Sequence, residues 1–138
     1  VKLIPNALYI KDGTFDYGGP PTNTTMRSLH QSTWHEGKPD ETVEAITLET
    51  LFKNENIEHV DLMKLDVEGS EIEILASPTF TNVAHKIDLI VGERHNWAGR
   101  HPNQLNEALK NAGFMVTTPA NDADIFIAER DALKDSIK

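Results

Sequence analysis

The chain has 138 residues, of which 13 are Lys or Arg and 22 are Asp or Glu, so its formal net charge is −9. An acidic chain without a basic cluster repels phosphate backbones, which argues against a nucleic-acid partner. The absence of Cys excludes disulfides and thiolate chemistry, and no apolar run reaches the ~18 residues of a membrane span. We therefore expect a single domain that is soluble and cytoplasmic and has no membrane partner.

The N-terminal part of the chain predicts a hairpin and a loop. Residues 7–11 and 14–17 are β-prone and flank Asp12-Gly13, a pair that favours the positive φ angles of a tight turn. Residues 18–40 are rich in Gly, Pro, Asn, Thr and Ser. This composition predicts a long surface loop.

The middle of the chain predicts alternating strands and helices. Residues 42–47 alternate as a strand does, and residues 48–54 carry one apolar helical face. Residues 60–66 form the next strand candidate. Ser70, followed by Glu73 three positions later, is a capping-box pattern that predicts a helix beginning near Glu71.

The C-terminal part predicts further α/β structure. Residues 87–93 are an almost continuous apolar run of strand length, which is typical of a strand buried on both faces in a parallel sheet. Pro102 begins a predicted helix that Gly113 ends. Residues 114–118 and 124–128 predict two closing strands, so the whole pattern is that of a layered α/β domain.

Chemically versatile side chains follow the two central predicted strands. Asp66 and Glu68 follow the first, with Glu71 one helical turn further on. Glu93 and His95 follow the second, with Trp97 in the next loop. Neighbouring strands lie ~4.8 Å apart, so Asp66 and Glu93 could share a ligand at the carboxyl edge of the sheet. Two carboxylates and an imidazole could bind a divalent ion or accept a proton from a hydroxyl. Trp97 could stack on a ring-shaped substrate or be partly buried.

Glu71 and Glu73 have a simpler interpretation. Both fall in the first turn of the predicted helix, where carboxylates offset the macrodipole.

Residues 60–75, with the sequence Val-Asp-Leu-Met-Lys-Leu-Asp-Val-Glu-Gly-Ser-Glu-Ile-Glu-Ile-Leu, resemble the signature of FkbM-type S-adenosylmethionine-dependent methyltransferases. Residues 43–52 resemble the segment before that signature, and residues 87–95 resemble the following strand with its Glu-x-His end. The resemblance covers essentially residues 1–138, but only the C-terminal portion of the family domain.

The resemblance implies a Rossmann-like three-layer α/β sandwich of the class I methyltransferase fold, with sheet order 3-2-1-4-5-7-6. This chain would hold a partial fold with a mixed sheet and a closing antiparallel strand pair. Residues 61–66 and 87–93 would be strands 4 and 5. The sequence lacks the GxGxxG cofactor loop, and we expect the cofactor-binding half of the domain to precede Val1. Strand 4 would then be an exposed edge, which we expect to be covered in a longer chain, by the N-terminal strands or by a second copy in a homodimer.

The implied function is methyl transfer from S-adenosylmethionine to a hydroxyl of a small molecule or sugar. Asp66 or His95 would be the catalytic base, and Glu68, Glu93 and Trp97 would bind substrate. A divalent metal is compatible with the site but is not required by the resemblance, and the cofactor-binding residues stay unassigned. One alternative is a non-catalytic methyltransferase-like module that self-associates through the strand edge. Another is a metal-dependent hydrolase that uses the same carboxylates.

Overall fold

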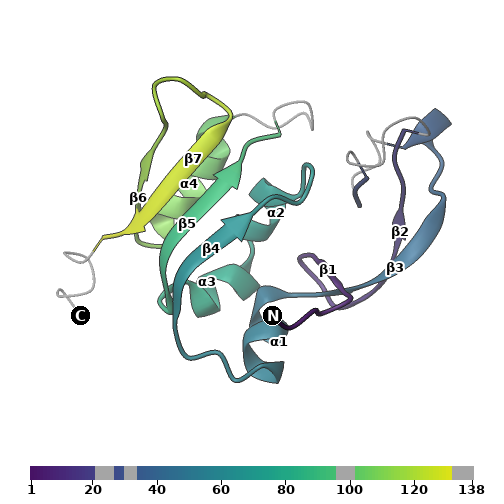
Figure 1. Ribbon diagram of the computed structural model, residues 1–138, viewed down its shortest axis with the longest axis horizontal. Helices are drawn as coiled ribbons and strands as arrows, with labels where there is room; N and C mark the ends of the chain where they lie inside the picture. Colours follow the sequence, from purple (N-terminus) through teal and green to yellow (C-terminus); the bar gives the residue numbers. More distant parts are fainter. Residues whose placement is uncertain (21–26, 30–33, 96–101, 132–138) are drawn as a thin grey trace.

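The strands of the protein form two separate sheets, seen in a computed structural model that describes residues 1–20, 27–29, 34–95 and 102–131 (Figure 1). The smaller sheet has the order β1-β3-β2, with β1 Ala7–Leu8, β3 Glu41–Ile46 and β2 Gly13–Tyr17. The larger has the order β4-β5-β7-β6, with β4 Val60–Leu65, β5 Ile87–Glu93, β7 Ile125–Arg130 and β6 Phe114–Thr117.

The smaller sheet corrects the predicted N-terminal hairpin. β1 and β2 are not paired with each other, because β3 lies between them, parallel to β1 and antiparallel to β2. The side chain of Asp12 accepts hydrogen bonds from the backbone N–H of Thr47 and from the hydroxyl of Thr50, 2.7 Å each. Asp12 therefore ties the chain between the two strands to the start of a helix instead of forming a two-residue turn.

The predicted loop at 18–40 lies partly outside the described residues. In its described part, Gly18 and Ser28 form an antiparallel bridge, and residues His35–Gly37 form one turn of 3-10 helix. This segment therefore contains short hydrogen-bonded structure.

The larger sheet confirms the strand order that the resemblance implies for this half of the fold. β5 is parallel to β4 and antiparallel to β7, and β6 is antiparallel to β7. The mixed sheet and its closing antiparallel pair are thus present. Among the described strands, β4 pairs with β5 alone and forms one edge of the sheet.

Helices cover one face of the larger sheet. They are α1 Leu48–Asn54, α2 Glu71–Leu75, α3 Pro78–Ala84 and α4 Pro102–Asn111 (Figure 1). The register places Ile90, Phe126 and Phe114 on the covered face, and all three side chains are fully buried. Phe80 of α3 stacks on Phe114, with ring centroids 6.2 Å apart. The apolar core therefore lies between these helices and the sheet.

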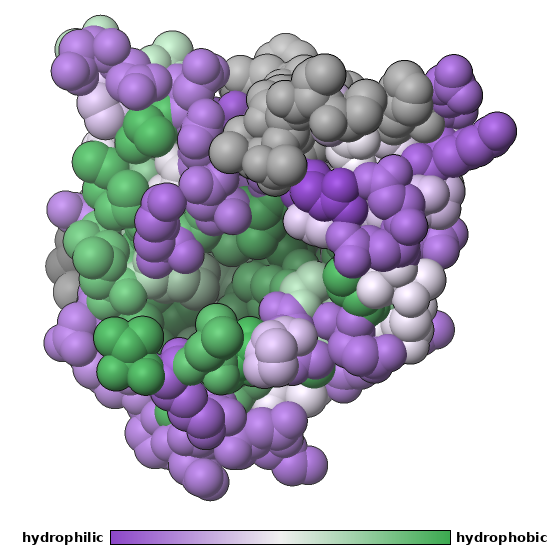
Figure 2. Space-filling model, turned by 45° about the vertical axis from the view of Figure 1, so that its right-hand side comes forward, coloured by the Kyte–Doolittle hydropathy of each residue, from purple (hydrophilic) through white to green (hydrophobic). Residues whose placement is uncertain are grey.

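The third layer of the expected sandwich is not seen in the described part of the chain. On the face opposite the helices, the register aligns Leu62 with Leu89, and Leu62 and Met115 are 57% and 52% exposed. Figure 2 shows apolar side chains gathered around a hollow on this side of the molecule. The described residues form a two-layer α/β arrangement that is consistent with half of a methyltransferase-like fold.

Candidate active site

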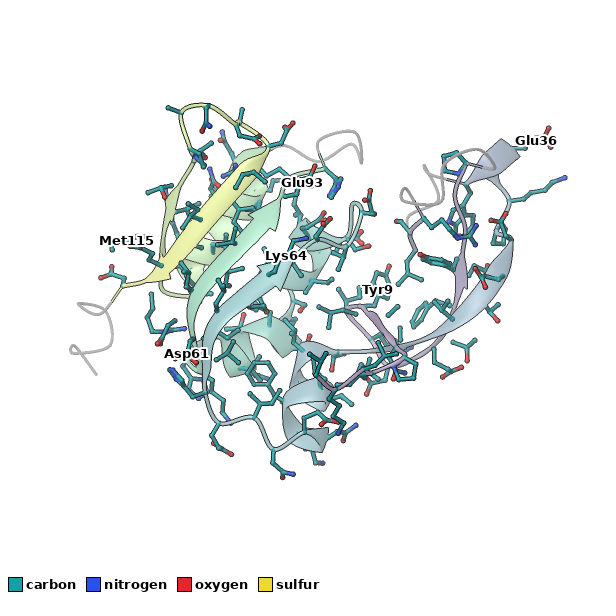
Figure 3. The ribbon with its side chains drawn as sticks, viewed as in Figure 1. Tyr9, Glu36, Asp61, Lys64, Glu93 and Met115 are labelled. Atoms are coloured by element: carbon teal, nitrogen blue, oxygen red, sulfur yellow. The ribbon has the colours of Figure 1, made fainter. Side chains whose placement is uncertain are left out.

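The carboxyl ends of β4 and β5 lie side by side, as the sequence predicts. Leu65 is in register with Gly92 in the parallel pair, so Asp66 and Glu93 come next at the same edge of the sheet. Figure 3 shows Glu93 at the upper end of β5 and Lys64 on the neighbouring β4. The structure therefore brings four of the expected residues, Asp66, Glu68, Glu93 and His95, to one end of the sheet. Trp97 lies outside the described residues.

A tight turn joins β4 to α2 and points its polar groups towards the site. Glu68 and Gly69 have φ angles of 50° and 105°, so both residues lie in the region that favours glycine. A non-glycine residue held in that region is a local strain that the surrounding structure must offset. The turn places the side chain of Glu68 beside His95.

The capping box predicted for this turn does not form. Ser70 precedes α2, but its side chain makes no capping hydrogen bond. Instead, Glu71 accepts hydrogen bonds from the backbone N–H groups of Val67 and Gly69, at 3.0 and 3.1 Å. The helix begins at Glu71 as predicted, but a different carboxylate satisfies the turn.

The buried centre of the site is a contact between His95 and Glu71. His95 Nδ1 lies 2.7 Å from Glu71 Oε1, and the two side chains are 7% and 3% exposed. From the sequence, the preferred role for Glu71 is to offset the helix macrodipole. In the sequence, Glu71 stands two residues after Gly69 at the end of a strand-to-helix turn, and this position is the signal that could have identified the contact.

His95 presents its other ring nitrogen to two carboxylates. Nε2 lies 3.4 Å from Glu68 Oε2 and 4.0 Å from Asp66 Oδ1. Burial raises the pKa of Glu68 above its usual value, His95 opposes that shift, and the nearby charges of Asp66 and Glu93 add to it. The arrangement is a group of acceptors around one imidazole, which suits it to receive and pass on a proton.

The same three side chains could hold a divalent cation. One ligand atom each from Asp66, Glu68 and His95 lies within 4.8 Å of the others. Carboxylate oxygens and an imidazole nitrogen suit several divalent ions. Asp66 also forms an ion pair with Lys64 at 3.1 Å, which a cation would have to displace or share.

A cavity of about 440 Å³ lies between the β4-α2 turn and the smaller sheet. One wall includes Asp66 and Glu68, and the other includes Leu8, Tyr17 and Arg27. Arg27 is held by Asp40 and Glu41, at 2.7 and 2.5 Å, so its charge is balanced within the protein. The cavity therefore presents net acidic character and an aromatic ring, which suits an uncharged polar ligand better than an anion.

Arg94, next to the site residues, has a structural role. Its guanidinium donates to the carbonyl oxygens of Ala123 and Ile125 and to the side chains of Asn106 and Thr118, at 2.7 to 3.2 Å. Burial lowers the pKa of Arg94 from its usual value. These contacts fasten the end of β5 to β7 and α4, so Arg94 is not placed to hold an anionic ligand.

Comparison with known proteins decides the family. The model of the methyltransferase FkbM domain matches residues 6–116, which is most of the chain. The chain belongs to the FkbM methyltransferase domain family. No curated protein and no solved structure matches the chain. Within the described residues of this FkbM-family chain, no helix has the length and apolar content needed to cross a bilayer.

Proposed function

We propose that this FkbM-family protein is an S-adenosylmethionine-dependent O-methyltransferase that acts on a hydroxyl of a small molecule or sugar. The observation that carries the proposal is the buried His95, whose Nε2 faces Glu68 and Asp66 at the rim of the cavity. A hydroxyl must lose its proton to become an efficient nucleophile, and this cluster supplies proton acceptors where an acceptor hydroxyl could lie.

The described residues do not fit a complete cofactor site. The sequence has no glycine-rich GxGxxG turn, and the cavity walls that the structure describes are formed by the β4-α2 turn and the smaller sheet. We therefore propose that the chain is the C-terminal portion of a longer methyltransferase domain. S-adenosylmethionine, when bound there, supplies the methyl group. The residues of this chain act on the acceptor.

In the proposed mechanism, the acceptor enters the cavity with its reacting hydroxyl beside Asp66 and His95. Hydrogen bonds from substrate hydroxyls to Asp66, Glu68 and Glu93 orient the acceptor, and the reacting oxygen gives its proton to His95 or Asp66. Holding the oxygen in one orientation in the cavity supplies much of the rate gain expected of such an enzyme. The base supplies a further part.

Replacing Asp66 with alanine tests this function. In the full-length protein, we expect Asp66→Ala to lower turnover about 100-fold, because the substitution removes a carboxylate beside the reacting hydroxyl. The dissociation constant for S-adenosylmethionine, measured by calorimetry, should change less than about threefold. Turnover is measured as methyl transfer to a panel of sugar and small-molecule hydroxyls.

The matched control for this experiment is Asp61→Ala. Asp61 lies at the opposite end of the same strand, where its side chain is 97% exposed (Figure 3). Its loss should leave both quantities unchanged. Equal losses of turnover and cofactor affinity in Asp66→Ala would refute the role assigned to Asp66.

A second candidate is a non-catalytic methyltransferase-like module that self-associates through β4. Two observations favour it: β4 pairs with a single strand among those described, and Leu62 is largely exposed beside that edge. An unpaired strand edge invites pairing with another chain.

If the second candidate is correct, the chain is a dimer, and a charged side chain introduced on β4 should dissociate it. Light scattering should give about twice the 15.4 kDa mass of one chain, and Leu62→Lys should return the mass to that of a monomer because a charge on the contact face opposes burial. Met115→Lys, on the far edge strand β6, is the matched control and should stay dimeric. A monomeric wild-type chain would exclude this candidate.

A further inference from the structure

We propose that Glu71 is a positioning residue that holds His95 as the Nδ1–H tautomer and so leaves Nε2 as the proton acceptor of the site. The inference rests on the proposed function, and it assigns a specific role to a carboxylate for which the sequence favours an effect on the helix dipole. Glu71 acts through His95 and does not itself contact the acceptor.

The first argument is the contact itself. His95 Nδ1 and Glu71 Oε1 are 2.7 Å apart, a short hydrogen-bond distance, and both side chains are more than nine-tenths buried. A buried hydrogen bond to a charged group is stronger than an exposed one, and its loss leaves a buried polar group without its partner. The contact therefore restrains the orientation of the imidazole ring.

The second argument concerns which atom carries the proton. Both oxygens of Glu71 already accept hydrogen bonds from backbone N–H groups, of Val67 and Gly69. A carboxylate held in this way acts as an acceptor, so the proton between Glu71 and His95 belongs to Nδ1. In a neutral imidazole one nitrogen carries a hydrogen and the other a lone pair, so Nε2 is the basic atom.

The third argument is that Nε2 faces the side of the cavity where the acceptor hydroxyl must lose its proton and from which that proton can leave. It lies nearest to Glu68 and Asp66, both of which line the cavity. A proton that reaches Nε2 can pass to Glu68 at 3.4 Å, a side chain that is 24% exposed. Glu68 also lines the cavity, so a proton on its carboxylate has a route to solvent.

The competing explanation is that Glu71 only offsets the macrodipole of α2. Glu71 and Glu73 both lie in the first turn of this helix. Under that explanation the two residues are equivalent, since each contributes one negative charge near the same helix end. The pair Glu71→Gln and Glu73→Gln therefore separates the explanations with the same chemical change at both positions.

The test is nitrogen NMR of the His95 side chain in the full-length protein, at a pH where the ring is neutral. The wild type should show a protonated Nδ1 and an unprotonated Nε2, and Glu73→Gln should match it. Glu71→Gln should show a mixture of tautomers, because one amide oxygen cannot replace the carboxylate for three donors. Its kcat should fall about tenfold or more with little change in KM, because the ring loses the carboxylate that orients it and stabilises its protonated form.

Two results would overturn the proposal. One is a wild-type spectrum in which Nε2 carries the hydrogen, which needs no variant to fold. The other is an equal response of His95 to the two glutamine variants. Should Glu71→Gln fail to fold, Glu71→Asp keeps the charge but withdraws it from Nδ1, and the same change of tautomer is expected. The NMR result is independent of turnover, so an absence of methyl transfer with the expected tautomer would refute the function and leave the positioning role intact.

Discussion

Replacing His95 with glutamine should lower kcat for methyl transfer by about 100-fold or more, the usual contribution of a positioned general base. Glutamine can fill the space of the imidazole and reach a hydrogen-bond partner, but it cannot accept a proton at neutral pH. The measurement is the rate of methyl transfer at saturating acceptor in the full-length protein, with the thermal unfolding midpoint recorded for each variant.

His59 provides the matched control for this substitution. It too lies near two carboxylates, 3.6 Å from Asp61 and 3.2 Å from Asp88, but these side chains are exposed at the other end of β4 and β5. His59→Gln should therefore leave kcat unchanged. If both histidine variants lose the same activity, or if His95→Gln retains that of the wild type, His95 is not the base.

Replacing Arg94 with alanine should lower the free energy of unfolding by about 3 kcal/mol. The substitution removes four hydrogen bonds and leaves the carbonyl oxygens of Ala123 and Ile125 without their donor, and breaking such a buried charged network is strongly destabilising. The loss also removes the guanidinium from above the ring of Phe126. Urea denaturation monitored by circular dichroism measures the change.

Two comparisons keep this prediction specific. Arg94→Lys preserves the charge but not the planar set of donors, so it should recover less than half of the loss. Arg27→Ala, which breaks ion pairs with the exposed carboxylates of Asp40 and Glu41, should cost much less because such pairs are partly screened by water. A loss below about 1 kcal/mol for Arg94→Ala would show that its hydrogen bonds are replaced by water.

The larger sheet and much of the site could be predicted because their signals are local. The sequences of β4 and β5 each predict a strand without reference to the rest of the chain. Parallel pairing of the two strands then brings Asp66 and His95 to one edge of the sheet. The helix α3 was not predicted, although Ser77 caps it and Pro78 occupies its first position. Both residues are recognised helix-start signals.

The parts that sequence patterns missed depend on distant partners. No local sequence signal predicts that β2 pairs with β3, more than twenty residues later, and not with β1. The hydrogen bond between Glu71 and His95 likewise joins residues twenty-four positions apart. Ser70 has the sequence pattern of a capping residue, but its side chain makes no capping hydrogen bond, and the N–H groups of the turn donate to Glu71 instead. Competition between possible partners decides such cases, and a linear pattern does not rank them.

The insertion of β3 between β1 and β2 has a consequence for how the protein is made. As the chain leaves the ribosome, β1 and β2 cannot pair until residues 41–46 have emerged, because every pairing that the structure describes in this sheet involves β3. Closing such a loop loses chain entropy before any contact compensates it. The smaller sheet, and with it one wall of the cavity, therefore assembles only after the intervening segment has been synthesised.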